Sequence, residues 1–200
     1  MAAPRPLPIV PPVRRSMIWP PPPPGRPEWA WLLQLPPRGW ILRRLIRPGA
    51  ATVPDGGLVV SVGGGPGFEF REVERLRPRG VRWRGLLLDA QLAMLTQARR
   101  PGRPAARANG PDVALGDAVA LPLRDASVDL VLSLGVLCCM TDEGADAAAR
   151  EAWRVLRPGG YAVLSVPRWR GAADESRHTK VGFVRVGGGR PGRAVFRKRI

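Results

Sequence analysis

A chain of 200 residues, 44% of them hydrophobic, is long enough for one folded domain with an extension, and apolar enough to fill one core. Its formal net charge of +16 lies in the two ends, because residues 53–167 carry fourteen Arg against thirteen acidic residues. Only two of the 32 basic residues are Lys, and a GC-rich coding sequence also produces such an excess of Arg. The basic ends are therefore compatible with a nucleic-acid partner but do not favour one.

The scarcity of Cys and His argues against two kinds of site. Cys138 and Cys139 are adjacent in an apolar run, and neighbouring residues of a strand point to opposite faces, so no disulfide is expected between them. His178 is the only His and there is no C-x-x-C, so no metal site is predicted.

No apolar run reaches the ~18 residues of a membrane span, and the N-terminus lacks the apolar core of a signal peptide. We therefore expect a cytoplasmic protein without a membrane span.

The first 52 residues of the chain fall into two parts. Residues 1–27 are rich in Pro, with five in succession at 20–24, and are predicted to form a flexible, extended tail. Residues 28–52 are predicted to form a short helical lid or extension, with helices over 28–35 and 39–47. The remainder, 53–200, is predicted to be the folded domain.

Strand-forming and helix-forming segments alternate from residue 57 onward. This alternation predicts a parallel α/β sheet covered by helices on both faces. The expected strands are 58–62, 85–89, 112–115, 128–134 and 161–166, and the expected helices are 68–76, 90–100 and 142–156. Residues 181–186 and 193–198 are predicted to close the domain as a hairpin.

The first predicted strand runs into a turn with the spacing G-x-G-x-G at Gly63, Gly65 and Gly67. Glycines let the backbone approach a ligand closely, and the first amides of the following helix are unpaired donors. The dinucleotide fingerprint is G-x-G-x-x-G, and Phe68 stands in place of its third glycine, which disfavours a nicotinamide oxidoreductase. No Gly-Lys-Ser/Thr follows, which excludes a P-loop. The turn is predicted to bind the polar end of a ligand, with a ligand-free glycine turn as the alternative.

Two carboxylates follow the next strands, at the edge where ligands of open α/β sheets bind. Asp89 comes 22 residues after Gly67, a spacing that suits a carboxylate accepting both hydroxyls of a ribose. Asp117, with the amide of Ala118, could bracket the polar edge of an adenine. Each Asp alone could equally be a helix N-cap or a turn residue. Together with the glycine turn, the two favour a nucleoside site.

Four motifs stand in a fixed order along the chain. They are the strand and glycine turn at 59–67, the acid-ending strand at 87–89, the segments 116–118, 121–123 and 127–129, and Glu151 with the stretch 154–160. Their order resembles that of class I S-adenosylmethionine-dependent methyltransferases, among them the ubiquinone/menaquinone methyltransferases. The resemblance covers residues 53–167 well and 168–200 loosely.

The resemblance implies a Rossmann-like, doubly wound, seven-stranded sheet with the last strand antiparallel, and methyl transfer from S-adenosyl-L-methionine. It also implies cofactor-binding residues, namely Ser61, Gly63, Gly64, Gly65, Gly67, Asp89, Ala90, Asp117, Ala118 and Leu134. No catalytic residue is assigned, because methyl transfer depends mainly on holding the reactants in near-attack geometry. His178 lies in a polar loop and Tyr161 begins a strand, so neither is predicted to be a base.

Two features depart from the family pattern. Ser61 stands where the family usually has an acid that orients the loop and helps to hold the methionine ammonium. Only residues 168–180 connect the fifth and sixth predicted strands, where the family usually has a helix and a segment that caps the substrate. Two functions are therefore open: methyl transfer, and a non-catalytic binding module or partner subunit that docks on RNA or an acidic protein.

The end of the fourth predicted strand bears on the methyl acceptor. Residues 133–137 lack the Asn/Asp-Pro-Pro-aromatic motif that nucleic-acid amino methyltransferases carry there. Cys138 and Cys139 follow Leu137 without the Pro-Cys pair that RNA carbon-5 methyltransferases use as nucleophile. A small-molecule acceptor is therefore predicted.

Overall fold

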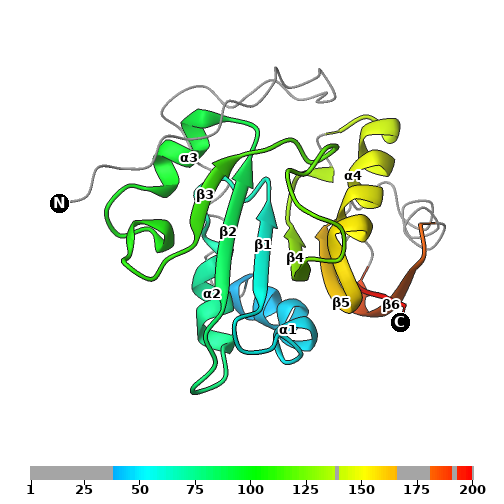
Figure 1. Cartoon of the computed structure of the whole chain (residues 1–200), viewed down its shortest axis with the longest axis horizontal. Helices are drawn as coiled ribbons and strands as arrows, with labels where there is room; N and C mark the ends of the chain where they lie inside the picture. The colour runs from blue at the N-terminus through cyan, green and yellow to red at the C-terminus, as the bar shows by residue number, and fades with distance from the viewer. Residues whose placement is uncertain (1–37, 138–139, 166–180, 191–192, 200) are drawn as a thin grey trace.

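A seven-stranded sheet forms the centre of the protein in a computed structural model of the chain (Figure 1). The structure describes residues 38–137, 140–165, 181–190 and 193–199. In chain order the elements are α1 (Arg38–Ala50), β1 (Leu58–Val62), α2 (Glu69–Leu76), β2 (Arg84–Asp89), α3 (Leu92–Ala98), the short 3₁₀ helix η2 (Pro104–Ala106), β3 (Asp112–Leu115), β4 (Val128–Ser133), α4 (Asp142–Val155), β5 (Leu156–Ser165), β6 (Phe183–Arg190) and β7 (Arg193–Lys198).

The strands lie in the order β3-β2-β1-β4-β5-β7-β6. The five that come first in the chain are parallel, and β1 lies between β2 and β4, with Val60 opposite Leu86 on one side and Val131 on the other. Strand β7 inserts between β5 and β6 and is antiparallel to both. The predicted seven-stranded α/β sheet with an antiparallel last strand is therefore confirmed, as is the closing hairpin.

Helices cover both faces of this sheet (Figure 1). Alternate residues of a strand point to opposite faces, so the strands divide the core into two clusters. The cluster with α4 includes Val60, Val62, Leu88, Val131, Ala162 and Leu164. The cluster with α1, α2 and α3 includes Val59, Leu87, Leu130, Leu132, Val163 and Val195. Burial on both sides explains the continuous apolar runs of β1 and β4. None of the described helices is long and apolar enough to cross a membrane.

Helix α1 belongs to this core. Its residues Leu45, Ile46 and Ala50 are buried in the second cluster. Gly49 lies so close to the sheet that a Cβ there would come within 2.8 Å of the side chains of Leu130 and Tyr161. Figure 1 shows α1 beside the ends at which the parallel strands begin. Residues 28–37 of the predicted lid segment lie outside the described residues, and the division of the chain at 27 and 52 stays a prediction.

The passage from α4 to β5 differs from the prediction. Strand β5 begins at Leu156, five residues earlier than expected, because Leu156 already pairs with Val128. The next pair joins Leu130 to Tyr161, so the residues around Pro158 form a bulge. The Pro-Gly-Gly sequence thus interrupts a strand that has already started, rather than separating the helix from the strand.

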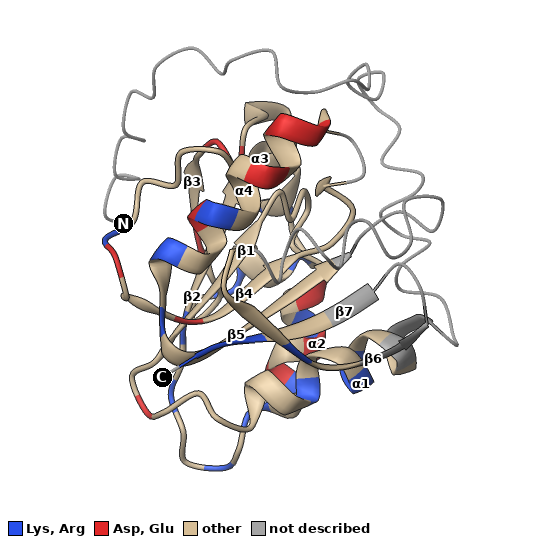
Figure 2. Ribbon diagram, turned by 90° about the vertical axis from the view of Figure 1, so that its right-hand side faces the viewer, with Lys and Arg blue, Asp and Glu red and all other residues tan. Residues whose placement is uncertain are grey.

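Charged residues lie at both ends of the sheet. Figure 2 shows basic residues on α1 and acidic residues in the first turns of α4, which include Asp142 and Glu143. Arg82 and Arg84, at the start of β2, are exposed at the end where the parallel strands begin. The opposite end, where these strands finish, carries Asp89 and Asp117.

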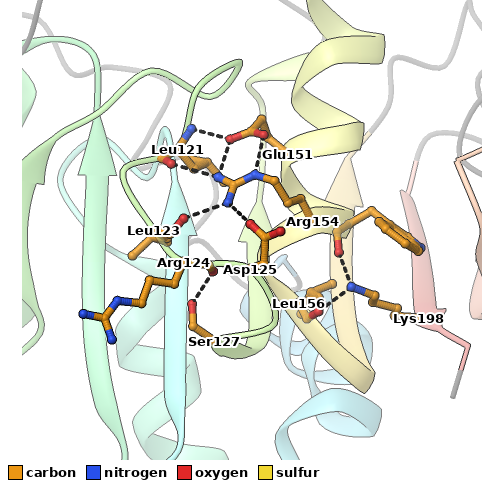
Figure 3. Close-up of polar contacts among 10 residues, drawn as sticks. Leu121, Leu123, Arg124, Asp125, Ser127, Glu151, Arg154, Leu156 and Lys198 are labelled. Carbon is orange, nitrogen blue, oxygen red and sulfur yellow. Dashed lines mark hydrogen bonds and ion pairs between the residues drawn. The ribbon is translucent and has the colours of Figure 1, made fainter.

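Lys198 ties the closing hairpin to the end of α4. Its side chain is buried, and its Nζ donates to the backbone carbonyls of Trp153 at 2.8 Å and Leu156 at 2.7 Å (Figure 3). Carbonyls in the last turn of a helix have no partner within the helix. Lys198 therefore supplies donors at the end of α4, much as a C-terminal capping residue does.

Candidate cofactor site

The loop of residues 63–67 leaves β1 and leads into α2. Gly63, Gly65 and Gly67 have φ values of 63°, 51° and 74°, in a region that residues with side chains rarely adopt. This conformation explains why glycine recurs at every second position. The N–H of Gly63 donates to the carbonyl of Leu88 at 2.7 Å, which fastens the loop to the end of β2.

Asp89, at the end of β2, is joined to this loop. Its Oδ2 accepts the N–H of Gly65 at 3.0 Å, and its Oδ1 accepts the N–H of Gln91 at 2.9 Å. Burial raises the pKa of Asp89, and these two N–H groups act against the rise. Ala90, which is half-buried, follows at the same strand end. A carboxylate oxygen can accept more than one hydrogen bond, so Asp89 can hold the loop and still accept ribose hydroxyls.

Asp117 and Ala118 follow β3 in a turn. Oδ1 of Asp117 accepts the N–H of Val119 at 3.1 Å, and its carbonyl accepts the N–H of Ala120 at 3.1 Å. The side chain of Ala118 is buried in the core cluster of the α4 face. Asp117 thus shapes the turn that carries it, at the same edge of the sheet as the glycine loop.

Arg154 of α4 braces the chain that follows this turn (Figure 3). Its guanidinium donates to the carbonyls of Leu121 at 3.0 Å and Leu123 at 2.8 Å, and to Oδ1 of Asp125 at 2.6 Å. It also donates to both oxygens of Glu151 at 2.7 Å, and Oε2 of Glu151 accepts the N–H of Leu121 at 2.7 Å. The hydrogen bond from Arg154 is the main cause that lowers the pKa of Glu151. Glu151 and Arg154, which belong to the motif at 151–160 that resembles the family pattern, therefore hold the loop after β3 in place.

Glu69, which is not among the residues predicted from the sequence, lies beneath the glycine loop. The hydroxyl of Ser61 donates to its Oε1. A Cβ on Gly64 would overlap both side chains, so the pair lies directly against the loop. Glu69 is only 7% exposed, and burial raises its pKa to about 7, while the hydrogen bond from Ser61 acts in the opposite direction. An acid in the first turn of a helix is common because it complements the helix dipole, so the sequence offered no specific signal.

The structure brings the ten predicted site residues to one edge of the sheet, at the ends of β1, β2, β3 and β4. Leu134, which is half-buried, comes directly after β4. Two residues later Val136 packs on the glycine loop, since a Cβ on Gly63 would overlap its side chain. The roles of the ten predicted residues in binding stay predictions.

The other candidates from the sequence are not part of this group. His178, Cys138 and Cys139 lie outside the described residues. Tyr161 is half-buried in β5, with the guanidinium of Arg197 5.8 Å from the centre of its ring. Among the residues that the structure describes, no three His, Cys, Asp or Glu side chains are grouped so that they could hold a metal ion.

The sequence matches the methyltransferase domain family over residues 60–164, more than half of the 200-residue chain. The chain belongs to this family. The matched span of the methyltransferase domain contains the glycine loop, Asp89, Asp117 and Arg154. S-adenosyl-L-methionine is accordingly the expected cofactor of the domain.

Individual methyltransferases resemble the chain over part of their length. An uncharacterized methyltransferase of Mycobacterium sp. (strain KMS) is 37% identical over 120 residues, which cover 60% of this chain and 42% of that protein. A ubiquinone/menaquinone biosynthesis C-methyltransferase of Acidiphilium cryptum (strain JF-5) is 41% identical over 101 residues, which cover 50% of this chain and 39% of that protein. The chain thus spans less than half the length of these curated relatives.

The methyltransferase fold is also found in solved structures. A candidate S-adenosyl-L-methionine-dependent methyltransferase of Methanococcus maripaludis superposes with a TM-score of 0.63 at 17% identity. The superposition covers 81% of this chain and 85% of that chain. At this level of identity the likeness shows the fold alone.

The residues of the site fit the chemistry of S-adenosyl-L-methionine. A Cβ on Gly65 would meet only Met94 Sδ, at 3.9 Å, so the loop backbone is open to close approach there. Asp89 offers acceptor oxygens for hydroxyl groups. Asp89 and Glu69 both lie at this edge, and a carboxylate favours a ligand that carries a sulfonium and an ammonium.

Proposed function

We propose that the protein transfers a methyl group from S-adenosyl-L-methionine to a small-molecule acceptor. The observation that carries the proposal is the 3.0 Å hydrogen bond from the N–H of Gly65 to Asp89. It joins the glycine loop to the predicted ribose acid at the strand ends, where ligands of open α/β sheets bind. Membership of the methyltransferase domain family supports the same cofactor.

Each part of the site has a role in this proposal. Asp89 accepts the ribose hydroxyls, Asp117 and the amide of Ala118 bracket the adenine edge, and the glycine loop lies against the methionine part. Ala90 and Leu134 complete the surroundings of the cofactor, and Ser61 contributes from beneath the glycine loop, where its hydroxyl holds Glu69. Arg154 acts from a distance, because it holds the loop after β3 in place.

Methyl transfer does not require a covalent intermediate with the protein. When bound, S-adenosyl-L-methionine would supply the methyl group, which would pass from its sulfur to the acceptor nucleophile while the electron pair of the broken bond stays on sulfur. The chain contributes by orienting the two reactants and excluding water, effects that can lower a barrier by up to ~7–11 kcal/mol. None of the described side chains is assigned as a general base.

Two observations support a small-molecule acceptor. Residues 133–137, which leave β4 beside the glycine loop, lack the motif of nucleic-acid amino methyltransferases. The Acidiphilium cryptum relative is named for ubiquinone and menaquinone, which are small molecules. For the alternative, a non-catalytic module docking on RNA or an acidic protein, the described residues offer no supporting observation.

The cofactor proposal is tested by calorimetric titration of the whole chain with S-adenosyl-L-methionine and, separately, with NADH. We expect S-adenosyl-L-methionine to bind with a Kd between about 1 µM and 1 mM, the usual range for enzyme substrates, and NADH not to bind. Binding of NADH alone would contradict the proposed cofactor.

The acceptor class is tested with methyl-tritiated S-adenosyl-L-methionine and three acceptor pools: small quinols and phenols, total RNA, and an acidic protein. We expect label in the small-molecule pool, with the Asp89→Ala variant as the negative control. Label in RNA or protein instead would overturn the acceptor class and leave the cofactor standing.

A further inference from the structure

The buried acidic side chains of the described protein differ in how their charge is balanced. Four are buried, namely Glu69, Glu72, Asp89 and Asp129. Two of them have arginine partners: Glu72 pairs with Arg43 and Arg75, and Asp129 pairs with Arg157. Within the described residues, neither Glu69 nor Asp89 forms an ion pair with Lys or Arg. The two buried acids without a cation are the two that lie against the glycine loop.

These two acids are satisfied to different degrees. Asp89 accepts backbone N–H groups on both of its oxygens, which compensates part of the cost of burial. Glu69 receives the hydroxyl of Ser61 and its own backbone N–H, which do not offset its burial, and Asp89 nearby adds negative charge that disfavours its ionised form. An ionised carboxylate in such surroundings is costly unless a positive charge comes close. Glu69 therefore has the stronger need for a cation.

The position of Glu69 indicates where that cation would come from. A Cβ on Gly64 would overlap its Oε1, so the carboxyl group lies directly against the backbone of the loop. The bond from Ser61 fixes the orientation of the carboxyl group. In the proposed function the cationic methionine part of S-adenosyl-L-methionine lies against this loop, so the ligand can supply the charge that the chain does not.

We propose that Glu69 is a specificity-determining residue of the cofactor site, whose carboxylate, held by Ser61 beneath Gly64, attracts the α-ammonium end of S-adenosyl-L-methionine through the loop. The inference rests on the proposed function for the identity of the ligand. It assigns to an acid in the first turn of α2 the role that the family usually gives to an acid at the end of β1, where this chain has Ser61. Glu69 acts through the loop, so it is a positioning residue and takes no part in the chemical step.

The experiment compares two ligands and two variants of the whole chain. S-adenosyl-L-methionine carries the ammonium and the sulfonium, whereas 5′-methylthioadenosine has the same nucleoside and neither charge. Glu69→Gln removes the carboxylate while keeping the shape of the side chain and an oxygen that can accept from Ser61. Glu72→Gln is the matched control, since it removes from the same helix a buried carboxylate that pairs with Arg43 of α1 and Arg75 of α2.

By calorimetric titration at pH 8, we expect Glu69→Gln to weaken S-adenosyl-L-methionine about tenfold or more, as for a charge-assisted contact, and to leave 5′-methylthioadenosine within about twofold of the parent. Glu72→Gln should leave both affinities within about twofold. An equal loss for the two ligands would show that Glu69 only supports the loop, and would overturn the inference while the proposed function stands. A parent that binds neither ligand would overturn both.

The parent chain provides a second measurement that does not depend on a variant. Because the pKa of Glu69 lies at about 7, the ratio of its affinities for S-adenosyl-L-methionine and 5′-methylthioadenosine should rise several-fold between pH 6 and pH 8. Asp89 of β2 is the titratable group that acts on Glu69, and Ser61 of β1 and the loop backbone are its other polar neighbours. A ratio that does not change with pH would overturn the inference even if Glu69→Gln failed to fold.

Discussion

At the scale of single residues, Asp89 joins two parts of the site. Its carboxylate accepts N–H groups from the glycine loop and from the turn before α3, and the proposed function adds the ribose hydroxyls. A residue with this double task affects both the shape of the loop and the affinity for the cofactor. Substitution at Asp89 is therefore the most direct test of the site.

Asp89→Ala is expected to weaken S-adenosyl-L-methionine binding by about 1.5–3 kcal/mol, the size of hydrogen bonds to a charged group. Calorimetric titration at neutral pH measures the difference. Asp112→Ala is the control, because Asp112 is an exposed acid at the start of the neighbouring strand β3. Equal affinities of the Asp89 variant and the parent would show that Asp89 serves only to hold the turn.

Glu69 makes the stability of the ligand-free protein depend on pH. Its ordinary pKa is 4.5 and its pKa in the fold is about 7, so between these values the unfolded chain loses the proton first. The free energy of unfolding therefore falls as the pH rises through this window, by about 3 kcal/mol at most, and the loss is complete above pH 7. Glu69→Gln has no proton to lose, so its stability should fall less.

Urea denaturation of the parent and of Glu69→Gln, at intervals from pH 4.5 to pH 8, measures this difference. We expect the variant to gain stability relative to the parent as the pH rises. Asp89, whose pKa burial also raises, contributes to both curves, so the difference between them reports the titration of Glu69 together with its electrostatic interaction with Asp89. Two curves that stay parallel over the whole range would contradict the raised pKa of Glu69.

The two acids also differ in how far the sequence predicts them. Asp89 ends an apolar strand at a spacing from the glycine turn that suits a ribose acid, so its place follows from local pattern alone. The environment of Glu69 depends on how α2 packs against β1, since Ser61 reaches it across that contact. Ser61 looks like the loss of an acid in the sequence, whereas in the structure an acid from α2 lies against it.

At the scale of elements, α4 acts as the support of the loop after β3. Arg154 and Glu151 between them bind backbone groups of Leu121 and Leu123, and Arg154 also reaches Asp125. Among the described residues, removing the guanidinium leaves the carbonyl of Leu123 and the carboxylate of Asp125 without a donor, whereas the carbonyl of Leu121 keeps the N–H of Leu123. The loop that carries Asp117 would then be held less firmly.

Arg154→Leu is expected to lower the free energy of unfolding by about 1–3 kcal/mol, the cost of leaving partly buried polar groups unsatisfied. It should also weaken S-adenosyl-L-methionine, since the adenine side of the site is loosened. Chemical denaturation and calorimetry measure the two effects. Arg150→Leu, on the exposed side of the same helix, is the control. Equal losses of stability in the two variants would show that the contacts of Arg154 with the loop after β3 contribute nothing measurable.

The elements themselves follow the hydrophobic pattern closely. Strands β1 and β3 have the predicted bounds, because turn residues flank short apolar runs. The early start of β5 could not be predicted, since Pro158 and the glycines after it are typical of a turn, while the pairing of Leu156 with Val128 depends on a partner strand far away in the sequence. Helix α3 is shorter than the predicted 90–100, because Asp89 and Gln91 shape a turn before Leu92.

At the scale of the whole molecule, α1 completes the cover of one face of the sheet. Ile46 is fully buried there, in one cluster with residues of α2, β4 and β7. Ile46→Ala is expected to lower the free energy of unfolding by about 2–5 kcal/mol, as for core residues in general. Leu92→Ala, at a position that is 55% exposed, should change it by less than about 0.5 kcal/mol. Urea denaturation measures both, and a similarly small effect for Ile46 would mean that α1 is a dispensable cover.

The burial of α1 also has a consequence for how this domain could be moved between proteins. The span recognised by its family, 60–164, omits α1 and both strands of the closing hairpin. A chimera that transplanted only this span would uncover the sheet beneath Ile46 and leave β5 without its antiparallel neighbour. Since the apolar surface so exposed favours aggregation, the smallest portable unit is larger than the recognisable one and includes both α1 and the closing hairpin of β6 and β7.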